Sequence, residues 1–533
     1  MRDQWIQRVN RSLLLLIIAG AACLRLYYID QPFVDGASWR EADDATIADN
    51  FYRGHLNIFL PEISWNGPGQ NYVGYEFQLT TYMAAIVYRV FGQVDWIGRG
   101  IAVAFGVWGV FAFYNLVRRA FNKVQALVSC AVLAVMPGAI VVDRSFLPDP
   151  VMVSLVITSF WMLLAYLQDG LSRYLVLAVI IGILGCLTKI SGLIVGIPMF
   201  YMILSLSPAD RRLRMRYLAR LAVGSILVTT PVVAYYAWAL HVAHAFPPYM
   251  VAAGNRWVWD AGFNSWLKAG FFWHQIAHIA RGVWGIPLLG VVLLGLLVPP
   301  AQRGKRDLRW LFHCWFSAGI IFYGLGAQEL VQNPWNLHII DPALAGLAGQ
   351  GLLVASAALA HLHVPLSGRA SVILIIVSLH GFDVRQHLRG SYTAYARQGY
   401  ELGTALERIS QPSDLVVTAA NATGDPVVIY YSRRRGWVFP PVWPGANPWE
   451  DIADEAAAIQ LFERLRFEGA QWFGIVAEQR RKYREKTPRL LKHIEDTTEL
   501  GAENRDWTIY RFLPPANSSR GYMDHTAAAA FPR

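Results

Sequence analysis

The sequence predicts a polytopic α-helical membrane protein that ends in a small α/β domain. Its 533 residues are 55% hydrophobic and only 16% charged, whereas soluble proteins have roughly 45–50% apolar and about 25% charged residues. The mean hydropathy is +0.32. Apolar runs dominate residues 1–384, and polar residues return in 385–515. We therefore expect a transmembrane domain followed by a domain in water.

A helix needs about 20 apolar residues to cross a hydrocarbon core ~30 Å thick, and this criterion predicts about eleven spans. Arg2, Arg8 and Arg11 precede the first run and no small-residue cleavage site follows it, so we expect an uncleaved span rather than a signal peptide. Lys189 separates two runs that are also compatible with one broken helix. The predicted spans are 12–29, 97–117, 124–142, 150–168, 173–188, 190–206, 219–240, 283–300, 309–327, 338–361 and 370–384.

Basic residues are concentrated in every second segment between the apolar runs. Because cytoplasmic loops carry an excess of Lys and Arg, this pattern places the N-terminus inside. The outer side then receives loops 30–95, 143–149, 241–282 and 328–337 and the C-terminal tail. Membrane orientation thus explains the net charge of +10, and no nucleic-acid partner is expected. The basic residues assigned to the inner side are Arg118, Arg119, Lys123, Arg173, Arg211, Arg212, Arg214, Arg216, Arg303, Lys305, Arg306, Arg309 and Arg369.

Strand-like runs and helical patterns alternate after residue 385, which predicts an α/β domain on the outer side. Residues 516–533 are polar and rich in alanine, and we expect them to be disordered. The predicted strands are Leu415–Thr418, Val427–Tyr431, Trp472–Val476 and Thr508–Phe512, and the clearest helical pattern is Ala456–Phe467.

The first outer loop begins with a dense group of carboxylates beside the membrane. On a helix that starts near Ser38, Trp39 and Asp43 share one face, and Arg40 and Asp44 form an i,i+4 pair. A partly desolvated carboxylate at the mouth of a membrane cavity has the raised basicity needed to take a proton from a hydroxyl. Asp43 is therefore a candidate base.

Glu41 is the second candidate base. Ser38 and Glu41 also match a capping box, in which the Ser hydroxyl caps the helix and the Glu reaches back to it, so a structural role is the alternative. For Asp43 the alternative is a solvated helix face. Asp44 and Asp49 are expected to be solvated or paired rather than catalytic.

A glycine-rich aromatic stretch from Trp65 to Phe77 follows in the same loop and includes Tyr75 and Glu76. Aromatic faces stack on sugar rings and carboxylates bind hydroxyls, which makes both residues candidates for substrate binding. An aromatic belt at the membrane interface is the alternative.

Four more polar residues lie at the outer ends of later runs. Arg144 is suited to bidentate phosphate binding, and Asp149 is suited to orienting an acceptor or stabilising positive charge at a sugar carbon. Lys189 lies between apolar runs, where an unpaired ammonium is costly, so a lipid phosphate is a suitable partner. The alternatives are snorkelling for Arg144 and Lys189, a helix cap for Asp149, and a structural role for His338 at the start of the tenth span.

The order of these features resembles the GT-C superfamily of membrane glycosyltransferases, in particular the branch of protein O-mannosyltransferases and the bacterial aminoarabinose–lipid A transferase. Bacterial members carry a Trp-Arg-Gln-Ala-Asp-Thr stretch in the first loop, from which this chain departs at Glu41 and Asp44. The motifs that carry the resemblance are Trp39–Asp44, Asp143–Pro150, Leu187–Lys189 and Tyr430–Trp437.

The resemblance implies a donor with a hexose or pentose on a polyprenyl phosphate, and an acidic base in the first loop, Asp43 before Glu41. It also implies a bacterial inner membrane, a cytoplasmic N-terminus and a periplasmic C-terminal domain. The predicted catalytic residues are Asp43, Glu41 and Asp149, and the predicted substrate-binding residues are Arg144, Lys189, Trp39, Arg40, Tyr75, Glu76 and His338.

The predicted reaction is a single displacement that inverts the anomeric carbon and transfers the sugar to a hydroxyl of a lipid, polysaccharide or protein. Arg144 and Lys189 would stabilise the charge on the leaving phosphate. The scheme requires no metal, although clustered carboxylates are able to hold Mg²⁺. A lipid or sugar transporter or flippase is the alternative, but the sequence lacks the internal repeats that are common in transporters.

Overall fold

A computed structural model describes residues 2–251, 258, 262–263, 266–280, 284–299, 308–326, 333–422, 424–441 and 454–514. The predicted disordered tail, 516–533, lies outside these residues. The chain forms two compact units. The first comprises Met1–Ile63 and Gln70–Tyr395, and the second comprises Ser64–Gly69 and Ala396–Arg533.

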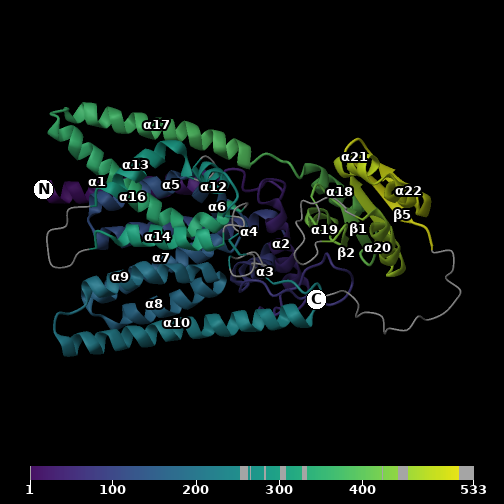
Figure 1. Cartoon of the computed structure of the whole chain (residues 1–533), viewed down its shortest axis with the longest axis horizontal. Helices are drawn as coiled ribbons and strands as arrows, with labels where there is room; N and C mark the ends of the chain where they lie inside the picture. Colours follow the sequence, from purple (N-terminus) through teal and green to yellow (C-terminus); the bar gives the residue numbers. More distant parts are fainter. Residues whose placement is uncertain are drawn as a thin grey trace. The chain divides into compact units, whose positions relative to one another are not determined.

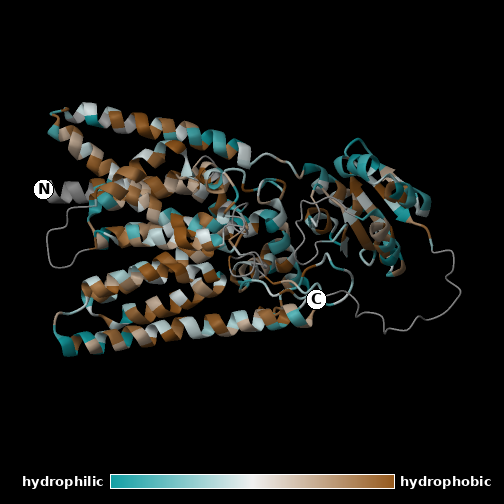
Figure 2. Cartoon of the chain, in the orientation of Figure 1, coloured by the Kyte–Doolittle hydropathy of each residue, from teal (hydrophilic) through white to brown (hydrophobic). Residues whose placement is uncertain are grey.

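The first unit is helical (Figure 1), and its long helices are predominantly hydrophobic (Figure 2). In chain order its elements are α1 (Arg2–Leu26), α2 (Ser38–Arg53), α3 (Leu79–Phe91), α4 (Asp95–Ala120), α5 (Lys123–Val135), α6 (Pro137–Arg144), α7 (Asp149–Asp169), α8 (Ser172–Thr188), η1 (Ile190–Val195), α9 (Gly196–Leu206), α10 (Arg211–Ala245), α12 (Phe271–Ile279), α13 (Ile286–Leu297), α14 (Leu311–Leu325), η3 (Pro334–Ile340), α16 (Asp341–His361) and α17 (Leu366–Ser391).

Five described helices are long and apolar enough to cross a membrane, or six if the bent pair α5 and α6 forms one span. The other predicted spans coincide with shorter apolar helices or with α17, so the number of about eleven stays a prediction. α5 and α6 meet at 63°, because Pro137 lacks an N–H and therefore begins a new helix. The chain also breaks at Lys189, which is extended between α8 and η1.

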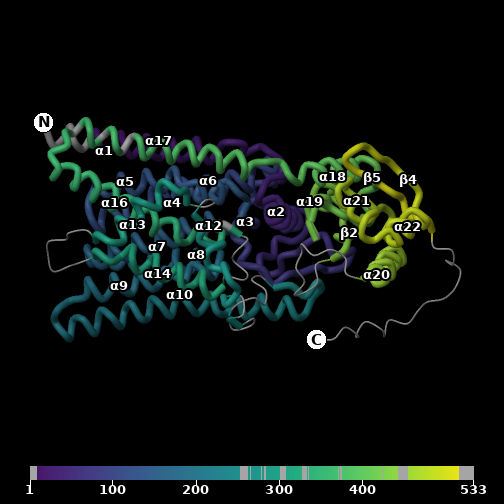
Figure 3. Tube along the Cα trace, turned by 45° about the horizontal axis from the view of Figure 1, so that its top comes forward, coloured from purple at the N-terminus to yellow at the C-terminus, as the bar shows by residue number. Residues whose placement is uncertain are grey.

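α7 is the central helix of the first unit and is almost completely buried between α4 and α8. Small residues allow α4 to approach it closely: a Cβ at Gly109 would lie 2.7 Å from the Ser154 hydroxyl oxygen. α8 packs on α7 and also on α10, and α8 and α10 can be followed in Figure 3. This packing fixes the start of α7, where Asp149 lies.

The predicted first outer loop contains two helices, α2 and α3. α2 begins at Ser38, as expected, but the capping box is wrong. Ala37 is the N-cap, the Ser38 hydroxyl donates to Tyr395 Oη at 2.9 Å, and the Glu41 carboxylate bonds to a different helix. α3 does not correspond to any predicted span, because its 13 residues are too few to meet the spanning criterion.

The second unit is built on a five-stranded mixed sheet with the order β2-β1-β3-β5-β4. β1 pairs in parallel with β2 and β3, and β5 pairs in antiparallel fashion with β3 and β4. The predicted strand Val427–Tyr431 is wrong, because this segment forms α19. The elements are α18 (Arg397–Ile409), β1 (Leu415–Ala419), α19 (Val427–Ser432), β2 (Arg435–Val438), α20 (Glu455–Phe467), β3 (Ala470–Val476), α21 (Ala477–Lys486), α22 (Pro488–Thr497), β4 (Thr498–Glu503) and β5 (Trp507–Phe512).

Candidate active site

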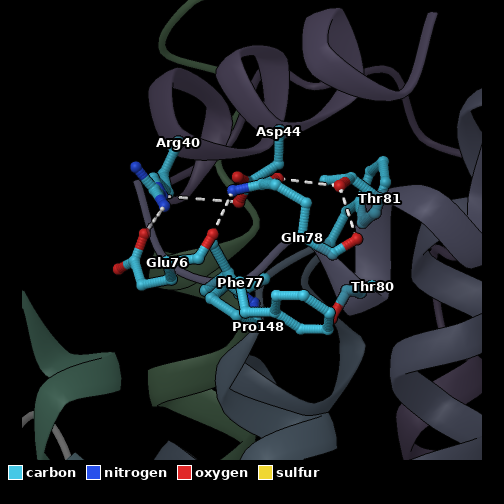
Figure 4. A pocket seen from close by; sticks show the side chains of 10 residues that line it. Arg40, Asp44, Glu76, Phe77, Gln78, Thr80, Thr81 and Pro148 are labelled. Carbon is cyan, nitrogen blue, oxygen red and sulfur yellow. Dashed lines mark hydrogen bonds and ion pairs between the residues drawn. The ribbon is translucent and has the colours of Figure 1, made fainter. Parts of the chain in front are cut away.

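Arg40, on the first turn of α2, lies between carboxylates from two segments (Figure 4). Its Nη2 donates to Oε2 of Glu76 at 2.8 Å, and its Nε lies 3.4 Å from Oδ2 of Asp44. The guanidinium also lies over the Tyr75 ring, 4.9 Å from the centroid. The predicted pair of Arg40 and Asp44 is therefore confirmed, although Asp44 is buried rather than solvated.

Arg40, Asp44 and Glu76 line a pocket between α2, the start of α3 and the turn before α7. The pocket has an empty volume of about 220 Å³, which includes space open to solvent. Two buried oxygen atoms in its wall, Oδ2 of Asp44 and Oγ1 of Thr80, have no hydrogen-bond partner among the described residues, although Oδ2 of Asp44 has the ion-pair contact with Arg40. Buried polar atoms without partners are costly. The pocket therefore suits a ligand that donates hydrogen bonds, as hydroxyl groups do.

Asp43 and Tyr75 extend this group of charges. Asp43 is buried, and its Oδ2 lies 3.9 Å from Nη1 of Arg40. Burial raises the pKa of the Tyr75 phenol well above its ordinary value, and the charge of Asp43 and a hydrogen bond with it act in the same direction. Tyr75 is thus a neutral hydrogen-bonding partner of Asp43 at neutral pH.

Burial raises the pKa of the Asp44 carboxyl well above its ordinary value, against the opposing charge of Arg40. The nearby carboxylates of Glu76, Asp43 and Asp149 raise it further. Four carboxyl groups from three segments therefore converge here, and Asp44 holds its proton more strongly than an ordinary aspartate.

Lys189 supplies a second cation beside this group. Its Nζ donates to Oδ1 of Asp149 at 2.8 Å and to Oδ1 of Asn336 at 3.0 Å. Oδ2 of Asp149 is buried, and no described residue donates a hydrogen bond to it. Although burial opposes it, the charges of Arg40 and then Lys189 hold the pKa of Glu76 below its ordinary value. Lys189 thus acts electrostatically on the carboxylates around the pocket.

Glu41 belongs to a separate, fully buried network. Its carboxylate accepts hydrogen bonds from Nε and Nη2 of Arg99 at 2.8 and 2.7 Å, and from the backbone N–H of Phe146 at 2.9 Å. Burial alone would raise the pKa of Glu41, but the charge and hydrogen bonds of Arg99 hold it below its ordinary value. Such a carboxylate is stabilised in its charged form and is a poor proton acceptor.

The structure also engages Arg144 and His338 in buried contacts. Arg144 donates to Oδ2 of Asp35 at 2.6 Å and lies over the Tyr392 ring. His338 lies between two carboxylates, with Nδ1 2.8 Å from Oδ2 of Asp341 and Nε2 2.9 Å from Oδ1 of Asp143. The contacts of His338 favour its structural alternative. Arg144 is completely buried, which contradicts snorkelling, and its guanidinium is engaged inside the protein. Trp39 is half-buried on α2.

No three His, Cys, Asp or Glu side chains within the described ranges are gathered in a way that could hold a metal ion. The described residues therefore contain no set of three such ligands for the Mg²⁺ that the clustered carboxylates suggested.

Comparisons with solved structures show the fold. The chain superposes on ArnT from Cupriavidus metallidurans bound to undecaprenyl phosphate, with a TM-score of 0.60 and 15% identity over 93% of this chain and 97% of that one. It superposes on an Archaeoglobus fulgidus oligosaccharyltransferase, in complex with Zn and sulfate, with a TM-score of 0.60 and 14% identity over 91% of this chain and 71% of that one.

The archaeal oligosaccharyltransferase AglB from the same organism, in complex with an inhibitory peptide and a dolichol-phosphate, gives a TM-score of 0.58 and 13% identity, covering 89% and 70% of the two chains. The chain thus has the fold of a GT-C superfamily membrane glycosyltransferase, as the sequence predicted. Residues 78–235 match the family model described as dolichyl-phosphate-mannose-protein mannosyltransferase. A comparison with curated protein sequences gives no significant match.

Sequence reasoning missed several residues of these networks. No spacing in the sequence indicates that Asn336 contacts a lysine 147 positions earlier in the chain. Arg99 and Asp35 were not considered, although an arginine inside a predicted span is itself a signal of a buried partner.

Proposed function

We propose that this chain transfers a sugar from a polyprenyl-phosphate-linked donor to an acceptor hydroxyl at the outer face of the bacterial inner membrane. Proteins of the same fold bind such carriers: ArnT was crystallised with undecaprenyl phosphate and AglB with a dolichol-phosphate. The observation that carries the proposal is the convergence of the α2 carboxylates, Asp149 and Lys189 beside one pocket.

Asp43 is the proposed general base. Asp44 already pairs with Arg40, and Glu41 is engaged with Arg99, so Asp43 is the better candidate to accept a proton from the acceptor. Asp43 takes the hydroxyl proton as the hydroxyl oxygen attacks the anomeric carbon and the bond from that carbon to the phosphate oxygen breaks. This single displacement inverts the anomeric centre.

Lys189 and Arg40 are the proposed cations for the leaving phosphate. Both are partly exposed, whereas the Arg144 side chain is only 1% exposed. Charge stabilisation by such groups strengthens as charge develops on the leaving group. Asp149, held by Lys189 with one oxygen free, is suited to bind an acceptor hydroxyl.

The test is a transfer assay with purified protein and radiolabelled undecaprenyl-phosphate sugars, hexose and pentose, offered with lipid, polysaccharide and peptide acceptors. Asp43→Asn is expected to lower the rate by about 10²–10⁴-fold, the contribution typical of a general base. Asp49→Asn is the matched control, because Asp49 lies on the same helix and pairs with Arg53 at 2.8 Å. A normal rate in Asp43→Asn would remove Asp43 as the base, and no transfer by wild type from any donor would end the proposal.

A further inference from the structure

The chain between α2 and α3 forms a hairpin whose tip belongs to the second unit. Within the first unit, Ile63 N–H donates to Asn71 O and Val73 N–H donates to Pro61 O, each at 3.0 Å. The residues between these strands, Ser64–Gly69, group with the C-terminal unit instead. The return strand of the hairpin leads directly to Tyr75 and Glu76, which contact Arg40.

The hairpin tip pairs with β2, which is an edge strand of the five-stranded sheet. Gly67 N–H donates to Gly436 O at 2.6 Å, and Gly436 N–H donates to Ser64 O at 3.1 Å. Val438 N–H donates to Trp65 O at 3.3 Å. The tip therefore adds an antiparallel strand to the sheet, in the way that an extended peptide binds to a sheet edge.

Side chains reinforce this pairing. Gly67 has φ +95°, and a Cβ there would lie 2.9 Å from Nε1 of Trp437, so both the backbone and the neighbouring ring require glycine. Arg435 Nη2 donates to Gly69 O at 2.7 Å. Trp65 is buried within the unit. An edge strand is normally protected from pairing, whereas here it is specifically paired.

We propose that the C-terminal domain is a positioning element for the active site, acting through this tip. By holding Ser64–Gly69, the domain fixes the hairpin and with it the return strand that presents Tyr75 and Glu76 to Arg40. The inference rests on the proposed function for its catalytic consequence, but its structural consequence is independent of that function. A displacement of about 1 Å in a positioned group is able to cost about 10²-fold in rate.

The matched variants are Gly67→Ala and Gly469→Ala in the full-length protein. Gly469 has φ +101° in the same unit, so alanine strains the backbone equally, but its Cβ would meet only Leu415 Cδ1 at 3.9 Å. Hydrogen exchange is measured at the amides of Val73 and Gly74, which donate to Pro61 O and Met250 O. We expect about tenfold faster exchange in Gly67→Ala and unchanged exchange in Gly469→Ala.

The catalytic readout is transfer from an undecaprenyl-phosphate sugar. Gly67→Ala is expected to lower kcat about tenfold or more while KM for the donor changes less than twofold. Arg435→Met is a milder second variant that removes the bond from Arg435 to Gly69 O. Equal exchange in Gly67→Ala and wild type, or equally accelerated exchange in both glycine variants, would overturn the proposal. Absence of transfer by wild type, with the exchange difference intact, would instead count against the proposed function and leave the positioning role standing.

Discussion

The substitution Glu41→Gln tests whether the Glu41 carboxylate has a structural or a catalytic role. The Glu41 side chain has no exposed area and accepts two hydrogen bonds from Arg99 and one from Phe146 N–H. The amide removes the negative charge that Arg99 contacts most closely, and Asp35, the other carboxylate described beside Arg99, lies 3.5 Å away. Breaking a buried ion pair from one side costs about 3–5 kcal/mol. We therefore expect a clear fall in the thermal stability of the detergent-purified protein.

The same variant is expected to keep transfer activity per folded molecule near the wild-type value, because Glu41 is not the proposed base. Unfolding is followed by the loss of the monodisperse peak after heating, and transfer is measured on the fraction that remains. A Glu41→Gln protein with normal stability and a loss of rate of about 10²-fold or more would refute the assignment. As a control, Arg99→Leu is expected to cost less in the Glu41→Leu background than in wild type, since the two residues are coupled.

Burial raises the folded-state pKa of Asp44, so this carboxyl ionises at a lower pH in the unfolded chain than in the folded protein, and wild type loses stability as the pH rises above about 4. Asp44→Asn should therefore melt at a higher temperature than wild type, and the difference should grow as the pH rises above about 4. Burial raises the pKa of Asp425 from 3.8 to about 6, so the folded state loses about 3 kcal/mol of stability relative to the unfolded chain as the pH rises through this range. Asp425→Asn removes this loss and should slow hydrogen exchange in β1 and α19 at pH 8 but not near pH 4. Lys189→Met should weaken binding of undecaprenyl phosphate, measured by native mass spectrometry, about tenfold or more, and unchanged binding would remove Lys189 from the phosphate site. Arg40→Lys should lower transfer about tenfold, because an ammonium does not reproduce the planar guanidinium that contacts two carboxylates and an aromatic ring; a normal rate would show that charge alone suffices.

Helices could be predicted from the sequence where the apolar runs are long. A helix that crosses the hydrocarbon core needs about 20 consecutive apolar residues, and few other structures contain such a run. α4, α7 and α10 coincide with predicted spans for this reason. Val427–Tyr431 shows why the tail was harder: a run of two valines, an isoleucine and two tyrosines has β propensity, yet it is a buried helix. Tertiary packing there overrides local preference, and no local signal reports it.

The site was predictable only in its parts. The sequence identifies α2 as acidic and Lys189 as costly in an apolar setting, because both judgements depend on local composition. It does not show that Glu41 contacts Arg99, 58 positions away, while Asp43 lies 3.9 Å from Arg40. Adjacent carboxylates on one helix point in different directions, and their roles depend on elements far along the chain.

Two buried charged networks lie near the start of α2, and they differ in how their carboxylate oxygens are satisfied. Every carboxylate oxygen of Glu41 and Asp35 accepts a hydrogen bond. Within the described ranges, Oδ2 of Asp149 accepts none, and Oδ2 of Asp44 has an ion-pair contact with Arg40 at 3.4 Å but no hydrogen bond. Carboxylate oxygens that already accept hydrogen bonds stabilise one arrangement, whereas buried oxygens that accept none carry an energetic deficit that a hydroxyl donor removes on binding. Substitutions in the first network should therefore be detected as lost stability. Substitutions in the second should change binding and rate while the fold persists.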